Sequence, residues 1–265
     1  MQPFSYYGGK QKLVKHILPL LPLHDVYVEP FAGGASVFWA KPPNRNEVLN
    51  DLNSEIVNFY EVLKHPRLSR FLDQRLQATL YSRDNYRRAV AIYKNPDGHS
   101  KVSRAWALFF NANGSFSNQL NTGFAYSLNS RDRLAFFKKA EALLSNAERL
   151  KNCHIENKDA VELIKAWDSP NTLFYCDPPY INTDQGHYSG YTEADYKKLL
   201  DTLGAIKGQF ILSGYPNDLV PKNWDFVEIK TRMSASGGKK LGDKKRIECL
   251  WFRINKTQLN LELAL

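Results

Sequence analysis

The sequence predicts an α/β fold that is interrupted by a helical insertion. Short apolar segments typical of buried strands alternate with helical patterns near both ends of the chain, and several of them run into a glycine or a carboxylate. The middle of the chain has helical patterns and no convincing alternation of apolar and polar residues. We therefore expect residues 1–64 and 151–265 to form one α/β domain, and residues 65–150 to form a helical domain inserted into it.

The first part of the chain is expected to contain two pairs of a strand and a helix. The expected elements, in chain order, are a helix over residues 12–21, a strand over 25–29, a glycine-bearing turn over 30–36, a helix from residue 37, a strand over 47–51 and a helix over 54–63. This opening is typical of nucleotide-binding α/β folds.

Strand patterns return after the arginine-rich helical region, which is broken by a polar loop over residues 111–130. The later strands are expected over residues 153–155, 172–176, 209–213, 226–229 and 249–252. The residues from Thr192 to Asp195 match a capping box and predict the start of a helix that continues to Leu203.

Composition places the chain among ordinary globular proteins. Its 265 residues are 43% hydrophobic and 24% charged, with 15 glycines and 13 prolines, which excludes the disordered, collagen-like and disulfide-scaffold classes. Lysine and arginine number 36 against 27 aspartates and glutamates, so the net charge is +9 and the isoelectric point is near 9.3. This excess favours a polyanionic partner, nucleic acid before membrane.

The cysteines predict neither a disulfide framework nor a structural metal site. Cys153, Cys176 and Cys249 lie far apart in the sequence, with no CxxC pair and no clustered histidines. No apolar run approaches the roughly 18 residues of a membrane span. The short apolar segment 17–23 contains two prolines and is not followed by a signal-peptide cleavage site. We expect a soluble cytoplasmic protein with no membrane association.

The tetrapeptide Asp177-Pro178-Pro179-Tyr180 directly follows the apolar strand expected over residues 172–176. Open α/β sheets bind ligands beyond the carboxyl ends of their strands. Because proline has no backbone N–H, this loop offers acceptors, the Asp177 carboxylate and the Pro178 carbonyl, which suit an amino group with two hydrogens. Tyr180 adds a flat face for stacking against a planar base. The alternative is a proline-stiffened turn with an aspartate cap.

A second group of residues joins the turn after the first strand, Glu29 to Ser36, to Asp51, eighteen residues beyond Gly33. Small residues there let a ligand approach the backbone, and an acid that ends the second strand can accept hydrogen bonds from ribose hydroxyls. The spacing departs from the GxGxxG fingerprint, and Ala35 stands where a glycine would be expected. A tight turn followed by a helix cap at Asp51 explains the residues equally well.

The N-terminal segment Phe4-Ser5-Tyr6-Tyr7-Gly8-Gly9-Lys10 combines aromatic residues, two glycines and a lysine. These residue types could wrap the base and the carboxylate of a cofactor. A loop fixed by two aromatic side chains would have the same sequence, so this segment alone does not decide between the two.

Together these segments resemble the Dam-like family of DNA adenine-N6 methyltransferases, the D12 class. The resemblance covers, in the family's order, residues 4–10, 29–38, 51–53, 177–180 and 234–252. It implies a Rossmann-like sheet of seven strands, S-adenosylmethionine as the methyl donor, S-adenosylhomocysteine as the product, and no metal. It also implies that the α/β domain binds the cofactor and that residues 65–150 form the target-recognition domain, which binds DNA.

The resemblance also implies roles for individual residues. Those matched to cofactor contacts are Tyr6, Tyr7, Lys10, Phe31, Gly33, Asp51, Asp159 and Asp177. Those matched to catalysis are Asp177, Pro178, Pro179 and Tyr180. An N-cap of the helix expected over residues 160–166 is an alternative role for Asp159.

The implied mechanism follows from the chemistry of adenine. N6 is a poor nucleophile because its lone pair is delocalised into the ring. Acceptors from Asp177 and Pro178, aimed at the two N6 hydrogens, would make the lone pair available and stabilise the charge that develops on nitrogen. The methyl group would then transfer in line. Since N6 is inaccessible within the base stack, the adenine is expected to flip into a pocket closed by Tyr180.

DNA contacts are expected from a basic stretch near the C-terminus and from the insertion. The residues concerned are Lys239, Lys240, Lys244, Lys245, Arg246 and Asn113. The basic stretch suits phosphate contacts and would equally suit a solvated loop. Asn113-Gly114 resembles an element of the GATC-reading branch of the family. The basic residue and the Pro-Phe-Gly of that pattern are missing, so GATC specificity is not predicted.

The leading prediction is a bacterial or phage enzyme that methylates adenine N6 in double-stranded DNA at a specific site. It would act as a monomer or weak dimer, with or without a companion restriction endonuclease. Methylation of structured RNA or of cytosine N4 is an alternative, because such a loop suits any exocyclic amine on a planar base. A protein-glutamine methyltransferase is disfavoured, because its related loop usually begins with asparagine. A catalytically silent nucleic-acid-binding protein of the same fold is the alternative outside the enzymes.

Overall fold

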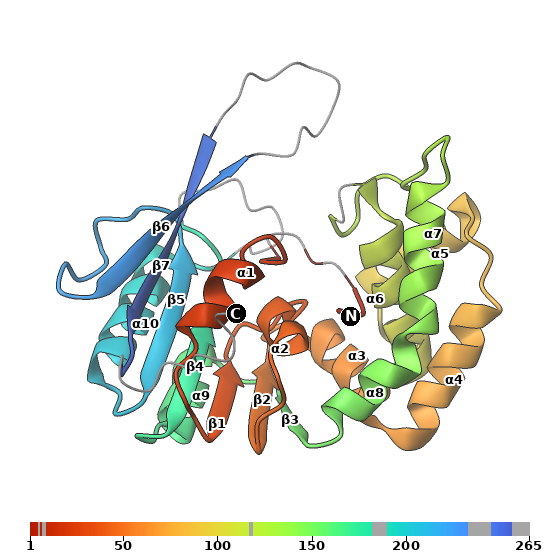
Figure 1. Cartoon of the computed structure of the whole chain (residues 1–265). Coiled ribbons are helices and arrows are strands. Elements are labelled where there is room, and N and C mark those ends of the chain that lie inside the picture. Colours follow the sequence, from red (N-terminus) through yellow and green to blue (C-terminus); the bar gives the residue numbers. More distant parts are fainter. Residues whose placement is uncertain (5, 7–8, 117–118, 182–189, 233–244, 256–265) are drawn as a thin grey trace. The chain divides into compact units, whose positions relative to one another are not determined.

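The computed structural model of the chain describes residues 1–4, 6, 9–116, 119–181, 190–232 and 245–255 (Figure 1). The chain divides into two compact units, each built from separate parts of the sequence. We call them the helical unit, with residues 1–14, 32–43 and 49–157, and the sheet unit, with residues 15–31, 44–48 and 158–265.

The strands of the chain are β1 (Val26–Glu29), β2 (Asn46–Asn50), β3 (Cys153–Glu156), β4 (Thr172–Cys176), β5 (Gln209–Gly214), β6 (Asp225–Arg232) and β7 (Lys245–Arg253). Their order is β3-β2-β1-β4-β5-β7-β6. Strand β4 pairs in parallel with β1 and β5, whereas β7 is antiparallel to β5 and β6. The order 3-2-1-4-5 is that of doubly wound α/β sheets, which bind ligands where the strand order reverses beside the first strand. Each strand overlaps one expected from the sequence, which confirms the α/β fold.

The core of the sheet unit lies between its strands and two helices, α9 (Ala160–Trp167) and α10 (Glu193–Ala205), which Figure 1 shows beside β4 and β5. Every residue of β4 and of β5 is buried, as in strands covered on both faces. Leu163 of α9, Leu203 of α10 and Phe174 of β4 are fully buried in this core. Each contributes roughly 1.5–3 kcal/mol through burial.

Helix α10 begins at the capping box that the sequence predicts. The Thr192 hydroxyl oxygen accepts the Asp195 backbone N–H at 3.2 Å, and the Asp195 carboxylate accepts the Thr192 backbone N–H at 2.8 Å. Two backbone donors at the start of the helix are thereby paired.

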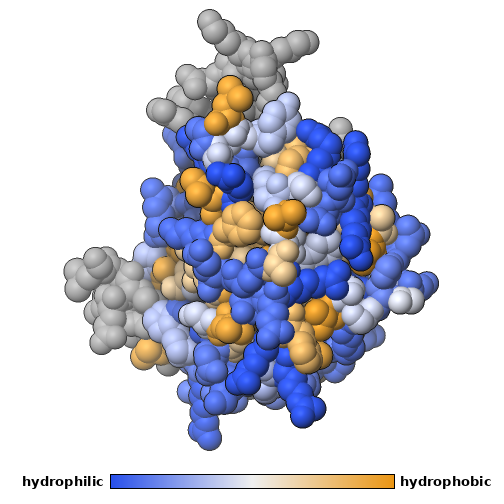
Figure 2. Space-filling view, turned by 90° about the vertical axis from the view of Figure 1, so that its right-hand side faces the viewer, coloured by the Kyte–Doolittle hydropathy of each residue, from blue (hydrophilic) through white to orange (hydrophobic). Residues whose placement is uncertain are grey.

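The helical unit contains α2 (Ser36–Ala40), α3 (Ser54–Lys64), α4 (Pro66–Gln77), α5 (Arg83–Lys94), α6 (Lys101–Gly114), α7 (Arg131–Glu141) and α8 (Leu143–Leu150). Phe59 of α3 and Phe109 and Phe110 of α6 are fully buried, so these two helices supply much of its core. Figure 2 shows the face over α4, α5 and α7, which is mainly hydrophilic with scattered apolar patches. Within the described part of residues 65–150, the strand pairing is limited to one isolated bridge, Ser115 to Phe124.

Several expected boundaries were wrong. Strands β6 and β7 are longer than the strands expected over residues 226–229 and 249–252, because the two pair along an antiparallel ribbon. The helix expected over residues 12–21 is shorter, with α1 (Val14–Ile17) followed by a 3-10 helix, η1 (Leu18–Leu20), because Pro19 has no backbone N–H to continue it. The loop expected from residue 111 begins at 115, because α6 continues through polar residues. Asn111 is paired inside the fold, where its Nδ2 donates to Asn121 Oδ1 and its Oδ1 accepts the Asn121 backbone N–H, both at 2.9 Å.

None of the helices in the described residues is long and apolar enough to cross a membrane. The three cysteines are free and buried. In the described ranges, no group of three or more histidine, cysteine or acidic side chains is placed to hold a metal ion.

Candidate active site

The backbone of Gly33 is fixed from three sides in the helical unit. Its N–H donates to Asp51 Oδ2 at 2.8 Å, and its carbonyl accepts the Tyr60 hydroxyl at 2.8 Å. The φ of Gly33 is +47°, and a Cβ at this position would lie 3.1 Å from Cδ1 of Tyr6, so the turn requires glycine. The fold thus brings Tyr6, Gly33 and Asp51 together from three separate segments.

Asp51 ties the turn to the start of α3. Its Oδ1 accepts the Asn53 backbone N–H at 2.8 Å, while Asn53 itself caps α3 by accepting the Glu55 N–H at 3.0 Å. Asp51 is therefore not the helix cap. Burial raises the pKa of the Asp51 carboxyl to about 6, although its backbone hydrogen bonds act in the opposite direction. Each carboxylate oxygen has a further lone pair, so the ionised group can also accept ribose hydroxyls.

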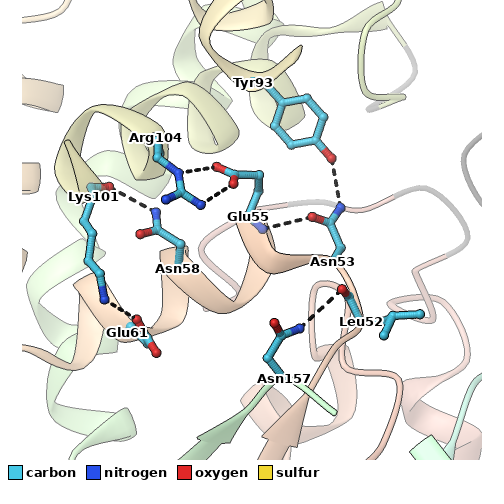
Figure 3. A network of polar contacts seen from close by, with 9 residues as sticks. All are labelled: Leu52, Asn53, Glu55, Asn58, Glu61, Tyr93, Lys101, Arg104 and Asn157. Carbon is cyan, nitrogen blue, oxygen red and sulfur yellow. Dashed lines mark hydrogen bonds and ion pairs between the residues drawn. The ribbon is translucent and has the colours of Figure 1, made fainter. Parts of the chain in front are cut away.

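The start of α3 is held by residues of the helical region, as Figure 3 shows. The Asn53 amide donates to the Tyr93 hydroxyl of α5 at 2.9 Å. Glu55, whose side chain is 7% exposed, forms a two-point ion pair with Arg104 of α6. The residues that follow Asp51 are therefore fixed by α5 and α6.

Two residues of the N-terminal segment, Tyr6 and Lys10, are buried in the helical unit. The Tyr6 carbonyl accepts the Gly9 N–H at 2.9 Å, and the Lys10 carbonyl accepts the Leu13 N–H at 2.7 Å. These turns place both residues in the core of the unit that contains Gly33. Tyr7 lies outside the described residues.

In the sheet unit, Asp177 directly follows β4 and is held by β5. Cys176 pairs with Leu212 across the parallel strands, so Asp177 lies level with Ser213. The buried Ser213 hydroxyl donates to Asp177 Oδ1 at 2.8 Å and accepts the Tyr175 hydroxyl at 3.4 Å. This chain of hydroxyls fixes the orientation of the carboxylate. Pro178 is buried beside it.

Tyr180 is held at two points. Its hydroxyl donates to Glu248 Oε2 at 2.9 Å, and its ring meets the Tyr215 ring edge-on, with centroids 4.5 Å apart and planes at 74°. Burial and the nearby carboxylates of Asp177 and Glu248 raise the pKa of Tyr180 well above its usual value, so the hydroxyl stays a donor. A cavity of about 370 Å³ lies beside this ring, and its lining includes Tyr180, Ile181, Ser213, Gly214, Tyr215 and Asn217.

Two more cofactor candidates lie in the sheet unit. Phe31 is partly buried and meets the Tyr191 ring edge-on at 6.2 Å. Asp159 is exposed and caps α9, where its Oδ1 accepts the N–H groups of Val161 and Glu162 at 3.0 and 3.2 Å. The cap is the alternative role expected from the sequence.

Asn113 is 7% exposed and uses both ends of its amide inside the fold. Its Oδ1 accepts the Lys139 ammonium at 2.7 Å, and its Nδ2 donates to the Pro3 carbonyl at 3.2 Å. Because this side chain is buried, a contact between Asn113 and DNA requires it to become exposed. Of the basic stretch, residues 239, 240 and 244 lie outside the described residues, and Lys245 and Arg246 begin β7.

Sequence reasoning missed several residues that hold the candidate site, chiefly Tyr60, Ser213, Tyr215 and Glu248. Ser213 stands at the carboxyl end of a strand expected from the sequence, and that position was a usable signal. Glu248 had none, because its contact with Tyr180 depends on the antiparallel register of β7.

The strand order is that of a doubly wound α/β sheet, with a glycine turn after β1 and an acceptor loop after β4. The sequence profile of the D12 class N6 adenine-specific DNA methyltransferases matches residues 6–229, and the chain belongs to this family. The membership confirms the resemblance found in the sequence and the expectation of an adenine-specific DNA methyltransferase, for which S-adenosylmethionine is the implied methyl donor.

Individual relatives match over most of the chain. The DNA adenine methylase of Salmonella typhi is 26% identical, and the alignment covers 87% of this chain and 88% of that protein. The type II methyltransferase M1.LlaDCHI of Lactococcus lactis subsp. cremoris is 24% identical, with 93% of each chain covered. The DNA N-6-adenine-methyltransferase of Escherichia phage P1 is 27% identical over 73% of this chain and 26% of its own length.

Proposed function

We propose that this chain transfers a methyl group from S-adenosylmethionine to N6 of an adenine flipped out of double-stranded DNA, with Asp177, Pro178, Pro179 and Tyr180 as the catalytic loop. The observation that carries the proposal is the Asp177 carboxylate, which Ser213 orients at the end of β4. Ser213 and Tyr180 also line a cavity of about 370 Å³. Cavities of roughly 300–1,000 Å³ are typical of small-ligand sites.

The residues matched to cofactor contacts suit S-adenosylmethionine. At Gly33 the Tyr6 ring lies where a side chain would be, so the turn brings this ring against the backbone, and the Asp51 carboxylate suits the two ribose hydroxyls. The cofactor supplies an electrophilic methyl group on a sulfonium. The residues proposed to hold it are Tyr6, Tyr7, Lys10, Phe31, Gly33, Asp51, Asp159 and Asp177.

The catalytic loop would act on the target amine by hydrogen bonding. The Asp177 carboxylate and the Pro178 carbonyl accept hydrogen bonds from the two N6 hydrogens. This arrangement turns the nitrogen lone pair out of conjugation with the ring, so that it is available to the methyl group. Positive charge develops on N6 as it gains the methyl group, and the fixed Asp177 carboxylate stabilises it without having to reorient. One N6 proton is then released, which leaves the neutral methylated amine. Tyr180 provides a ring for stacking against the flipped base, worth roughly 1–3 kcal/mol.

Residues 65–150 are proposed to form the target-recognition domain, and the basic stretch Lys239 to Arg246 is proposed to bind DNA phosphates. The name of the Lactococcus relative, a type II methyltransferase, supports a companion restriction endonuclease. Relatives from bacteria and a phage support action in the cytoplasm of a bacterial host. The enzyme would act as a monomer or weak dimer.

The proposal is tested by Asp177→Ala, with Asp201→Ala on the exposed side of α10 as the matched control. Methyl transfer to unmethylated DNA should fall by at least about 100-fold in Asp177→Ala, because a fixed group that stabilises the transition state is lost. The thermal unfolding midpoint should stay near that of wild type, and Asp201→Ala should be fully active. Full activity of Asp177→Ala would contradict the proposal. Mass analysis of digested nucleosides separates N6-methyladenine from N4-methylcytosine and from modified RNA.

A further inference from the structure

We propose that Glu248 is a positioning residue for methyl transfer. It holds the Tyr180 ring in the orientation in which the target base stacks on it. This inference rests on the function proposed above for the Asp177 loop. Glu248 itself need not touch the base, because it would act through the Tyr180 hydroxyl.

The topology of the sheet unit brings Glu248 to the catalytic loop. Cys249 of β7 pairs with Gly214 at the end of β5, so Glu248 lies level with Tyr215, beyond the last residue of β5. On its other side, Glu248 pairs with Ile229 of β6. The side chain is thus placed at the carboxyl edge of the sheet, where Asp177 also lies.

The burial of Glu248 calls for an explanation. It is 9% exposed, in a strand where an apolar side chain would pack at no electrostatic cost. A buried carboxylate is unfavourable unless it is hydrogen-bonded. One hydrogen bond comes from the Tyr180 hydroxyl at 2.9 Å. The buried carboxylate of Glu248 is unfavourable for packing but is hydrogen-bonded to Tyr180 of the proposed catalytic loop. These two observations indicate that Glu248 serves that loop.

The geometry fixes the ring of Tyr180 at two places. Glu248 holds the hydroxyl end, and the Tyr215 ring meets the Tyr180 ring at 74°, with centroids 4.5 Å apart. The two rings meet at a corner, and both line the cavity of about 370 Å³. A base in this cavity can stack on one ring and meet the other at its edge. Loss of the Glu248 acceptor would release the restraint on the hydroxyl end of the ring.

The charge of Glu248 would also favour the reaction. A phenol that donates to a carboxylate has a more electron-rich ring, and aromatic faces attract cations. The base gains positive charge as N6 is methylated, so this attraction is stronger in the transition state than in the ground state. The predicted effect therefore falls on kcat rather than on KM.

The test is a double-mutant cycle of Tyr180→Phe, Glu248→Leu and the double variant, with Glu248→Gln as the conservative variant. Initial rates are measured with unmethylated plasmid DNA and S-adenosylmethionine. Each single variant should lower kcat about tenfold, and the double variant should lose no more than either single variant, because both remove one hydrogen bond. Glu248→Gln should recover part of kcat, and KM for S-adenosylmethionine should not change.

Wild-type kcat in Glu248→Leu, or additive losses in the double variant, would overturn the inference. If Glu248→Leu does not fold, equal kcat values for Tyr180→Phe and Tyr180→Phe/Glu248→Gln support it, and a further loss in that double variant overturns it. Absence of methyl transfer to DNA by the wild-type chain would overturn the proposed function itself, so the two failures are distinguishable.

Discussion

Asp51 Oδ2 accepts the backbone N–H of Gly33, a residue eighteen positions earlier, at 2.8 Å. The contact joins the turn after β1 to the end of β2. Because Asp51 also accepts the Asn53 N–H at 2.8 Å, one carboxylate orders both the glycine turn and the entry to α3. Protonation of the Asp51 carboxyl is therefore expected to change the geometry of the proposed cofactor contacts.

Cofactor affinity should depend on pH through Asp51. Burial raises the pKa of its carboxyl to about 6, so the group is ionised above this pH and protonated below it. Only the ionised form accepts two ribose hydroxyls while keeping both backbone contacts. Calorimetric titration with S-adenosylhomocysteine should show constant affinity above pH 7 and a loss of about tenfold by pH 5. Asp51→Asn should bind weakly at every pH, and a decline that persists in this variant would assign the titration to another group.

Gly33→Ala should weaken cofactor binding. The residue has φ +47°, and the new Cβ would lie 3.1 Å from the Tyr6 ring, so Tyr6 would shift. Gly98→Ala is the matched control, since Gly98 has φ +75° and nothing within 4 Å of an added Cβ. Both variants should lose about 1–2 kcal/mol of unfolding free energy to backbone strain. Affinity for S-adenosylhomocysteine should fall about tenfold in Gly33→Ala alone, and equal affinities in the two variants would be evidence against the Gly33 turn as a cofactor contact.

Ser213→Ala should slow methyl transfer with little effect on cofactor affinity. The variant removes the donor that lies 2.8 Å from Asp177 Oδ1. Hydrogen bonds to charged groups contribute roughly 1.5–3 kcal/mol, so kcat should fall about 10- to 100-fold. Ser169→Ala, which removes a hydroxyl pair with Thr172 at the start of β4, should keep wild-type kcat. Equal kcat values in the two variants would show that Ser213 does not orient Asp177.

Arg104→Met should destabilise the helical unit. It leaves the Glu55 carboxylate, 7% exposed, without its two-point partner, and breaking a buried pair in this way costs roughly 3–5 kcal/mol. The exposed pair of Lys101 and Glu61 provides the control, because Lys101→Met should cost less than about 1 kcal/mol. Urea unfolding measures both variants. Similar urea midpoints for Arg104→Met and Lys101→Met would contradict this prediction, because they would mean that the Glu55 carboxylate is hydrated in solution.

The strands and the two central carboxylates could be predicted because they leave local signals. A strand covered on both faces is a continuous apolar run, as in residues 172–176, and an acid at its end is conspicuous. Ser213 also stands at the end of an expected strand, but its partner depends on the register of β5 against β4. Glu248 left no local signal, because its contact depends on the register of β7, which local sequence does not encode. The start of the loop after α6 was misplaced because Asn111 is polar but paired internally with Asn121.

The contacts of Asn53 with Tyr93 and of Glu55 with Arg104 limit how freely residues 65–150, the proposed recognition domain, can be exchanged. A chimera that takes residues 65–150 from a relative would keep the α3 entry in place only if the donor supplies both partners. The described residues of the loop after α6 are bonded instead to α5 and α6, where the Tyr86 hydroxyl donates to the Thr122 carbonyl and Asn111 pairs with Asn121. Grafting new target preferences is therefore best confined to that loop, with α5 and α6 kept as part of the recipient.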